Sequence, residues 1–272
     1  MVRSLWTAAS GMLAEQTNVD AIANNIANVS TTGFKSQQNE FKTLLYQTLQ
    51  TKTTSANGAT KPTSAQVGLG VRNAAMETIF TQGELEQTDS TTDFAIQGSG
   101  LFAVTDGQGN TSYTRNGSFT WALNSSGGVS LTTSDGYPVL DSTGKAISLA
   151  NTYVSSKITI SSDGTLNYPD SSGNAKSLGI KIGVYQFQNP GGLEKEGNSL
   201  YQATAASGAA INEATSTAVT KSKLSQGYLE ASNVQVADEM VNLITAQRAY
   251  ELNSKAITAS DEMMQQANQL RS

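Results

Sequence analysis

The chain has 272 residues and a formal net charge of −5, and charged residues make up 14% of it. This composition argues against nucleic acid as a partner, because neutralising phosphates requires clustered Lys and Arg. The sequence has no Cys and no His, which excludes disulfides and metal sites built from thiolates or imidazoles. His is also the commonest general base. We therefore expect no cofactor, and we predict that the protein is not an enzyme.

No stretch approaches the roughly 18 apolar residues of a membrane-spanning helix, so we expect no membrane insertion. Near the N-terminus, Ser10, Gly11 and Glu15 interrupt the apolar core that a cleaved secretion signal needs. If the protein leaves the cytoplasm, we expect it to use another export route. Attachment of this segment to a membrane surface is an alternative, but its polar face carries Glu15 and Asp20 rather than Lys and Arg.

The N-terminal segment has apolar residues at intervals that alternate between three and four, which is the spacing of a coiled coil. This pattern predicts a helix of about 28 residues. Ser4 is the expected N-cap, and Gly33 is the expected left-handed residue that ends the helix. The seam positions are Leu5, Ala8, Met12, Glu15, Val19, Ile22, Ile26 and Val29, and Glu15 is the one that is not apolar.

Three asparagines, Asn24, Asn25 and Asn28, fall outside this seam. Their amides could form hydrogen bonds with further helices without the desolvation cost of charged groups. That interpretation suits a helix contacted on several sides by copies of itself. Solvated surface residues are the alternative, and the residues alone leave both interpretations open.

The segment after this helix has two parts. FKTLLYQTL (residues 41–49) is compatible with a helical turn or with a strand, and the sequence does not decide between them. Residues 50–66 are poor in apolar side chains and rich in Thr, Ser and Ala. This composition predicts a flexible loop.

The middle of the chain, from about residue 72 to 224, is predicted to be β structure. Short strand candidates separated by turn-forming dipeptides favour an antiparallel sandwich or an irregular barrel. The hairpin-type dipeptides are Asp106-Gly107, Asn116-Gly117, Asp135-Gly136 and Asp163-Gly164. The strand candidates are residues 101–105, 111–115, 117–121, 157–161 and 180–187.

The C-terminal segment predicts a second helix from about residue 233 to 269. Ser232 and Gln235 have the spacing of a capping box. Large and small residues alternate along the seam, which would let a neighbouring helix approach closely. The large seam residues are Val236, Leu243, Tyr250, Ile257 and Met264, and the small ones are Ala246, Asn253, Ser260 and Ala267.

Four stretches of the sequence resemble the bacterial flagellar rod and hook proteins. SGMLAEQTNVDAIANNIANVSTTGFK (10–35) is similar to the N-terminal signature of that family, and AQRAYELNSKAITASDEM (246–263) to its C-terminal signature. LEASNVQVADEMVNLI (229–244) and DFAIQGSGLFAV (93–104) also fit. Within the family, the length and the polar insertion at residues 46–66 point to the distal part of the rod. A proximal rod protein or a hook-type protein is the alternative.

The resemblance implies a discontinuous α+β fold in three parts. Residues 1–34 and 228–272 would form a terminal helical assembly domain of coiled-coil type. Residues 35–71 would be a connecting region with a rod-type insertion, and residues 72–227 an antiparallel all-β outer domain. Copies would assemble helically into a hollow shaft that carries torque from the motor to the hook.

The resemblance also implies partners and a location. The partners would be further copies of the chain, proximal rod proteins, the hook protein, the P- and L-ring bushing proteins, and the flagellar type III export apparatus. The location would be the basal body, in a rod that spans the periplasm. We predict that both chain ends are largely disordered before assembly, because unpaired helices are only marginally stable in water.

We expect the side chains of both terminal helices to carry self-assembly. The residues predicted for this role are Leu5, Met12, Val19, Ile22, Asn24, Asn25, Ile26, Asn28, Leu243, Tyr250, Ile257 and Met264. A peptidoglycan-cleaving enzyme is the alternative from another class, and it would use Glu84 and Asp93. Ser142 and Lys145 have the spacing of a serine acyl-transfer motif, but the surrounding DSTGK predicts a turn.

Overall fold

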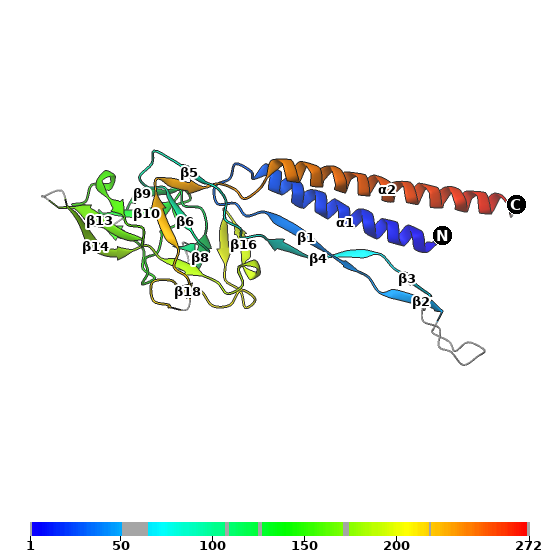
Figure 1. Cartoon of the computed structure of the whole chain (residues 1–272), viewed down its shortest axis with the longest axis horizontal. Helices are drawn as coiled ribbons and strands as arrows, with labels where there is room; N and C mark the ends of the chain where they lie inside the picture. The colour runs from blue at the N-terminus through cyan, green and yellow to red at the C-terminus, as the bar shows by residue number, and fades with distance from the viewer. Residues whose placement is uncertain are drawn as a thin grey trace. The chain divides into compact units, whose positions relative to one another are not determined.

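The computed structural model describes residues 2–50, 65–106, 109–124, 127–170, 174–217 and 219–270 (Figure 1). They form two compact units. Unit 1 takes its described residues from Met1–Ala27, Gln37–Thr78 and Gln235–Ser272, and unit 2 from Asn28–Ser36 and Ile79–Val234. Two long helices and an antiparallel β-rich centre confirm the predicted α+β class. The predicted division of the chain into an assembly domain, a connecting region and an outer domain, with boundaries at residues 34, 71 and 227, stays a prediction.

Helix α1 spans Val2–Ala27, and its ends differ from the predicted ones. The helix already includes Ser4, so Ser4 is not its N-cap. It ends before Gly33 because Asn28 starts a turn, in which its carbonyl accepts a bond from Thr31 N at 3.1 Å and its Oδ1 accepts one from Thr31 Oγ1 at 3.1 Å. Short polar side chains compete with helical bonding in this way. Gly33 does adopt a positive φ of 68°, but as part of the segment after the helix.

Helix α2 spans Val236–Gln269, so its predicted end is confirmed and its predicted start is wrong by about three residues. The predicted capping box does not form. Gln235 is the N-cap without a side-chain bond, and the Ser232 hydroxyl accepts a bond from Val234 N at 3.3 Å. Asp238 and Glu239 lie in the first turn, where carboxylates favour the positive end of the helix dipole.

The two helices lie side by side and antiparallel in unit 1 (Figure 1). Ser4 Oγ is 3.2 Å from Ser260 Oγ, and Asn25 Nδ2 donates to Glu239 Oε1 at 3.0 Å. Between these contacts, a side chain at Gly11 would meet Asn253. The small residues of α2 therefore face α1. On α1, the residues that meet α2 are Ser4, Gly11 and Asn25. Each lies one position before a residue of the predicted seam, namely Leu5, Met12 or Ile26. The small residues of α2 permit the closest approach of the two helices at these positions.

Unit 1 also contains two antiparallel pairs of strands. Strand β1 (Gln37–Thr43) pairs with β4 (Val71–Thr78), and β2 (Tyr46–Gln50) pairs with β3 (Ala65–Gly68). Within residues 41–49, which the sequence left open, residues 41–43 belong to strand β1 and residues 46–49 to strand β2. Of the loop predicted at 50–66, residues 51–64 lie outside the described residues, whereas Gln50 and residues 65–66 belong to strands.

Unit 2 is built from small antiparallel sheets. The orders are β16-β17-β8-β7-β15-β18, β11-β10-β9, β12-β13-β14, β19-β6 and β20-β5. The bounds are β5 Leu85–Gln87, β6 Phe94–Gln97, β7 Leu101–Thr105, β8 Thr111–Thr114, β9 Phe119–Leu123, β10 Val129–Thr133, β11 Ser148–Leu149, β12 Thr159–Ile160, β13 Thr165–Pro169, β14 Ala175–Lys181, β15 Val184–Gln186, β16 Glu194–Gly197, β17 Leu200–Gln202, β18 Ile211–Asn212, β19 Lys223–Gln226 and β20 Tyr228–Glu230, with short 3₁₀ turns η1 at Ser155–Lys157 and η2 at Pro190–Gly192.

Strand β7 is an inner strand of the six-stranded sheet of unit 2, and both of its faces are buried. Phe102 and Val104 point into the larger apolar cluster, where the Phe102 and Phe119 rings meet edge to face at 5.1 Å. Leu101 and Ala103 point into a second cluster on the other face. Burial on both faces explains the uninterrupted apolar run in the sequence.

Most predicted strands of unit 2 are present, with three corrections. The candidate at 157–161 shortens to β12, because Lys157 belongs to the 3₁₀ turn η1. The segment 180–187 is not one strand, because Gly183 passes close to the backbone of Asp141 and separates β14 from β15. Asn116-Gly117 is not a hairpin, since β8 and β9 pair with other strands. Gly117 instead approaches the Phe94 carbonyl, where a side chain would not fit. Asp163-Gly164 does join the paired strands β12 and β13.

Candidate self-assembly surface

Helix α2 presents apolar side chains on two faces. The predicted residues Leu243, Ile257 and Met264 are half-buried, and Tyr250 is exposed over 43% of its surface. They lie on the side of α2 that also carries Ala246 and Ser260, the buried residues of this helix. The predicted seam of α2 therefore packs largely against other parts of the same chain.

A second apolar stripe on α2 was not predicted from the sequence. Met240, Val241 and Ile244 project away from the buried Ala246, because they lie roughly 120° to 160° from it around a helix of 3.6 residues per turn, and Leu252 and Met263 lie at the edge of this face. Ile244, for example, is 54% exposed. The i, i+4 spacing of Met240 and Ile244 is a signal that could have revealed it. We call these residues the outer stripe: Met240, Val241, Ile244, Leu252 and Met263, all of them exposed.

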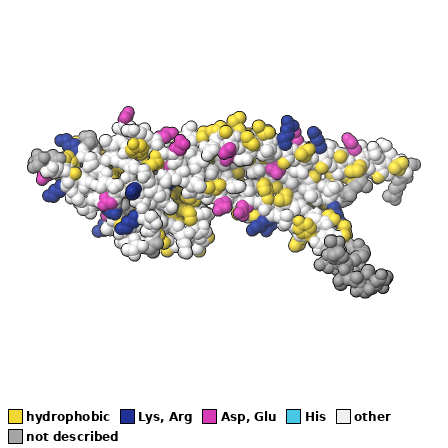
Figure 2. Space-filling view, in the orientation of Figure 1, with side chains coloured by type: hydrophobic (Ala, Val, Ile, Leu, Met, Phe, Trp, Pro, Cys, Tyr) yellow, Lys and Arg dark blue, Asp and Glu magenta, His cyan; other side chains and the backbone are white. Residues whose placement is uncertain are grey.

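Helix α1 has an outer face of the same kind. Trp6 and Leu13, seven residues apart, are 72% and 67% exposed. Of the predicted residues, Ile22 is buried at 5% exposure. The other predicted seam residues, Leu5, Met12, Val19 and Ile26, are half-buried. Figure 2 shows hydrophobic side chains at the surface along the helices of unit 1.

The three asparagines occupy different environments. Asn25 is buried, and its amide is satisfied inside the chain by Gln37 N and Gln37 O, both at 2.9 Å, and by Glu239. This is a correction to the expectation that Asn25 bonds to another copy. Asn24 is exposed and donates to Gln37 Oε1 at 3.2 Å. Asn28 belongs to unit 2 and forms the turn after α1.

A groove of about 410 Å³ brings two of the predicted residues together. Val19 from α1 and Tyr250 from α2 line it, together with Gln16, Gln247 and Glu251. Its wall combines an aliphatic side chain, an aromatic ring and amides, and lacks a cluster of like charges. Such a lining suits an apolar side chain of a neighbouring helix, with the amides positioned to bond at its edge.

The strands of unit 1 add further exposed apolar groups. Tyr46 and Leu45 lie at the start of β2 and are more than half exposed. Two-stranded pairs of this kind are marginally stable in water unless another surface covers them. The exposed large apolar residues of these strands and their connections are Phe41, Leu45, Tyr46, Leu49, Leu69 and Met76.

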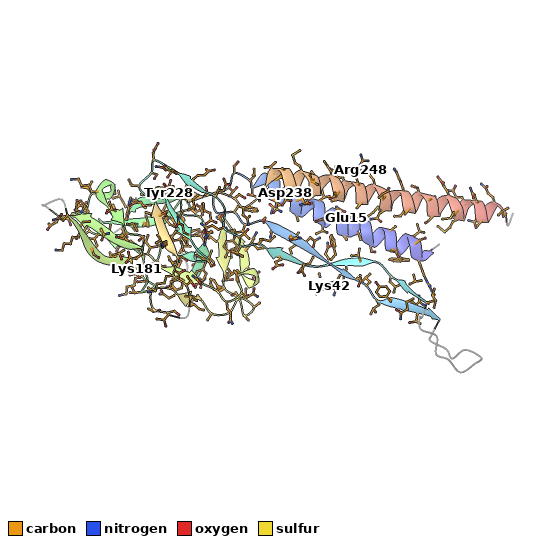
Figure 3. The ribbon with its side chains drawn as sticks, in the orientation of Figure 1. Glu15, Lys42, Lys181, Tyr228, Asp238 and Arg248 are labelled. Carbon is orange, nitrogen blue, oxygen red and sulfur yellow. The ribbon has the colours of Figure 1, made fainter. Side chains whose placement is uncertain are left out.

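Charges on the helices interrupt these apolar surfaces without dominating them. Arg248 and Glu15 are labelled in Figure 3 on α2 and α1. Arg248 NH1 is 2.9 Å from Glu251 Oε2, with the two side chains 73% and 52% exposed. A solvent-exposed pair like this one contributes about 0.5 kcal/mol. It leaves the outer stripe locally neutral rather than strongly charged.

The two carboxylates named for the alternative enzyme lie in different environments. Asp93 is buried and accepts a bond from Thr88 Oγ1 at 2.8 Å, whereas Glu84 is exposed. Ser142 and Lys145 lie in a turn, as predicted, in which Asp141 Oδ1 accepts a bond from Lys145 N at 2.9 Å. The described residues contain no group of three acidic side chains that could hold a metal ion. In the described part of the chain, neither α1 nor α2 has the length and apolar character needed to cross a bilayer.

Comparison with known proteins matches three parts of the chain to flagellar families. Residues 5–35 match the family described as flagella basal body rod protein. Residues 95–168 match the D1 domain of the flagellar hook protein FlgE/F/G family. Residues 225–270 match the C-terminal region of the flagellar basal body rod FlgEFG proteins. Each terminal match includes most of one long helix.

Individual relatives match over their full length. The chain is 45% identical to the flagellar basal-body rod protein FlgG of Borreliella burgdorferi, over 100% of this chain and 99% of the relative. It is 42% identical to FlgG of Buchnera aphidicola subsp. Acyrthosiphon pisum, over 99% and 100%. It is 33% identical to the flagellar hook-basal body complex protein FlhP of Bacillus subtilis, over the whole of both chains. With identity of this extent, the chain belongs to the family of flagellar basal-body rod proteins and is a structural component of the basal-body rod.

Proposed function

We propose that copies of this protein assemble helically through unit 1 into the distal rod, a shaft that transmits torque from the motor to the hook. One observation carries the proposal. Among the described residues, eighteen large hydrophobic side chains are exposed, and all but Leu123 and Val154 belong to unit 1. Exposed apolar surface gathered in one region is typical of a protein–protein interface.

The arrangement of this surface favours an open assembly. Apolar groups lie on the outer stripe of α2, on the outer face of α1 and on the strands, which are different surfaces. A chain whose distinct surfaces meet each other forms heterologous contacts, and these extend into a helical filament unless the rotation closes a ring. In this proposal, α1 and α2 of neighbouring copies pack as coiled coils around the axis, and the groove at Val19 and Tyr250 receives an apolar side chain of a second copy.

The family supports a wider role for this shaft. The shaft would contact proximal rod proteins at one end and the hook protein at the other, with P- and L-ring bushing proteins around it. Export would use the flagellar type III apparatus, and the rod would span the periplasm. The assignment to the distal rod is supported by relatives named FlgG that match the full length. We expect no catalytic activity, and the structural names of these relatives support that expectation.

Assembly would also complete the folding of the chain ends. Helices that lack part of their packing are marginally stable, and a segment that folds on binding loses conformational entropy at that step. We therefore expect residues 5–30 to be weakly protected in the monomer and strongly protected in the assembly. Hydrogen exchange on the purified monomer tests this point, and strong protection there would contradict it.

Electron microscopy of the concentrated, purified protein tests the proposal as a whole. We expect tubes or short stacks that disappear on dilution. A chain that stays monomeric at high concentration, and instead cleaves isolated peptidoglycan in a manner that depends on Glu84 or Asp93, would establish the enzymatic alternative. Vesicle binding in place of assembly would favour a membrane-surface role.

A further inference from the structure

A cluster of three charged side chains lies buried in unit 2. Lys35 Nζ is 2.6 Å from Glu230 Oε1, and the Arg115 guanidinium bonds to Glu230 Oε2. All three residues are exposed over 5% of their surface or less. One carboxylate therefore balances two cations at a place where an unpaired charge would be strongly disfavoured.

The cluster also binds the backbone of distant segments. Glu230 Oε1 accepts a bond from Gly83 N at 2.9 Å, and Lys35 Nζ donates to the Thr81 carbonyl at 2.6 Å. Arg115 donates to three carbonyls on the other side, those of Ile96, Gly98 and Gly100. Bonds to charged groups are stronger than neutral ones. Lys35 and Glu230, 195 residues apart, are thus joined to the segment 81–83 and to the sheet region around β6 and β7.

Asn233 forms a second set of bonds beside this cluster. Its Oδ1 accepts a bond from Ser36 N at 2.8 Å, and its Nδ2 donates to the Ile79 carbonyl at 2.8 Å and to Thr81 Oγ1 at 2.9 Å. Ile79 N in turn donates to the Ser36 carbonyl at 2.9 Å. One amide side chain therefore joins residues 36 and 79, which lie on different segments.

The joined segments are those that lead out of unit 2 along the chain. The chain passes between the units at residues 27–28, 36–37, 78–79 and 234–235. On the unit 2 side, all four passages begin or end in residues 28–36, 79–83 or 230–234. Phe80 of these segments packs beside the Tyr201 ring, with the ring centroids 5.2 Å apart. Short segments with few apolar contacts open easily, and the side-chain bonds from Glu230 and Asn233 hold them in place.

We propose that Glu230 and Asn233 are positioning residues that fasten the segments leading out of unit 2 to its sheets, so that force along the chain is passed on rather than absorbed by local opening. This inference rests on the proposed function as a shaft. It adds to that function the residues through which the β-rich unit is coupled to the assembling ends. Glu230 contributes charge-assisted bonds from a buried position, and Asn233 contributes neutral bonds from a half-buried one.

Hydrogen exchange on the full-length monomer provides the first test. The main variant is Asn233→Ala, which leaves no charge unpaired and should fold. Glu230→Gln is the second variant, and Glu84→Gln, at an exposed side chain of the same region, is the control. We expect amides of residues 28–36 and 79–83 to exchange at least tenfold faster in both variants. In Asn233→Ala the β7 and β8 amides should stay unchanged, whereas Glu230→Gln, which leaves Lys35 and Arg115 without their carboxylate, should accelerate β7 and β8 as well. In Asn233→Ala, equal acceleration in β7 and β8, or none in the two segments, would show that this residue stabilises unit 2 as a whole and would overturn the inference.

Bending of assembled tubes provides the second test. We expect tubes of Asn233→Ala to form and to have a persistence length at least twofold shorter than those of the wild type and of Glu84→Gln. Variant tubes as stiff as the wild type would overturn the inference alone. Failure of the wild-type chain to form tubes would instead overturn the proposed function, and the inference with it.

Discussion

Unit 2 and unit 1 treat their apolar side chains in opposite ways. In unit 2, aromatic and branched residues such as Phe102, Phe119 and Leu131 are almost completely buried around one core. In unit 1, the buried apolar side chains of the helices are mostly alanines, while Trp6 and Ile244 remain exposed. Burying a large apolar side chain contributes about 2 kcal/mol, and burying a methyl group contributes much less. The comparison indicates that the apolar side chains of unit 2 are packed within the chain, whereas many of those in unit 1 are not, which supports the proposed assembly through unit 1.

The largest effect that we expect comes from the core of unit 2. Phe102→Ala removes a fully buried ring from the centre of the apolar cluster, and we expect the free energy of unfolding of unit 2 to fall by about 4 kcal/mol. Hydrogen exchange of β7 and β8 amides under conditions of global opening measures this change. As the control, Leu123→Ala alters a side chain that is 84% exposed and should change the value by less than about 0.5 kcal/mol. Similar losses in both variants would mean that the core is not where the structure places it.

The next effect concerns the outer stripe of unit 1. Ile244→Asp introduces a carboxylate on a surface that we propose becomes buried between copies, at a cost of about 3 kcal/mol per contact. We expect the critical concentration for assembly to rise at least about 100-fold, since 1.4 kcal/mol corresponds to a tenfold change. Sedimentation of assembled protein at increasing total concentration measures it.

A matched change in unit 2 sharpens this test. Leu123→Asp places the same charge at an exposed leucine of the β-rich unit. It should leave the critical concentration within about twofold of the wild type, because the proposed contacts lie in unit 1. If Leu123→Asp blocked assembly and Ile244→Asp did not, the roles assigned to the two units would have to be exchanged.

Much of the fold could be predicted from local pattern. Strand β7 was predictable because both of its faces are buried, which gives an uninterrupted run of apolar residues. The extent of α2 followed from its seven-residue repeat. The ends of the helices were less predictable, since Asn28 and Ser232 bond to nearby backbone groups that a sequence pattern does not reveal.

The candidate assembly surface was predictable only in part. A seven-residue repeat shows that a helix has an apolar face, but it does not show whether the partner is the same chain or another. Ile22 satisfied the repeat and is buried inside the chain, while Ile244 lay outside the repeat and is exposed. Asn25 looked like a surface residue because its partner Glu239 lies 214 residues away. Contacts over such separations come from the three-dimensional fold.

A smaller effect is expected at the junction of α1, β1 and α2 within unit 1. Asn25→Ala leaves Gln37 N and Gln37 O without their side-chain partner in a buried place, at a cost of about 2 kcal/mol. If unit 1 orders on assembly, this cost should raise the critical concentration about 30-fold. Asn24→Ala is the control, because Asn24 is exposed on the same helix. An equal shift in both variants would show that the buried position of Asn25 has no special role.

The smallest effect is a pH dependence confined to unit 2. Lys195 lies over the Phe34 ring at 5.2 Å, and partial burial lowers its pKa to about 8 from an ordinary 10.5. Between those values the unfolded chain holds a proton that the folded chain has released. Because stability rises with pH wherever the unfolded state binds more protons, the free energy of unfolding of unit 2 should increase from pH 7.5 to 9.5. We expect a gain of about 1 kcal/mol, which allows for screening of a half-exposed group. Denaturant titration monitored in unit 2 measures it.

Two further groups fix the shape of this pH response. Burial also lowers the pKa of Lys35, which adds to the rise. Tyr201, which pairs with Lys195 across β16 and β17, has its pKa raised by burial to about 12 from 10. Above pH 10 the unfolded tyrosine loses its proton first, so stability should then decrease. Lys195→Met should weaken the rise between pH 7.5 and 9.5 and leave the decrease above pH 10 intact. If the free energy of unfolding of the wild type instead decreased between pH 7.5 and 9.5, Lys195 would not be desolvated in the folded unit. The interior of unit 2 would then be more hydrated than a fully packed core.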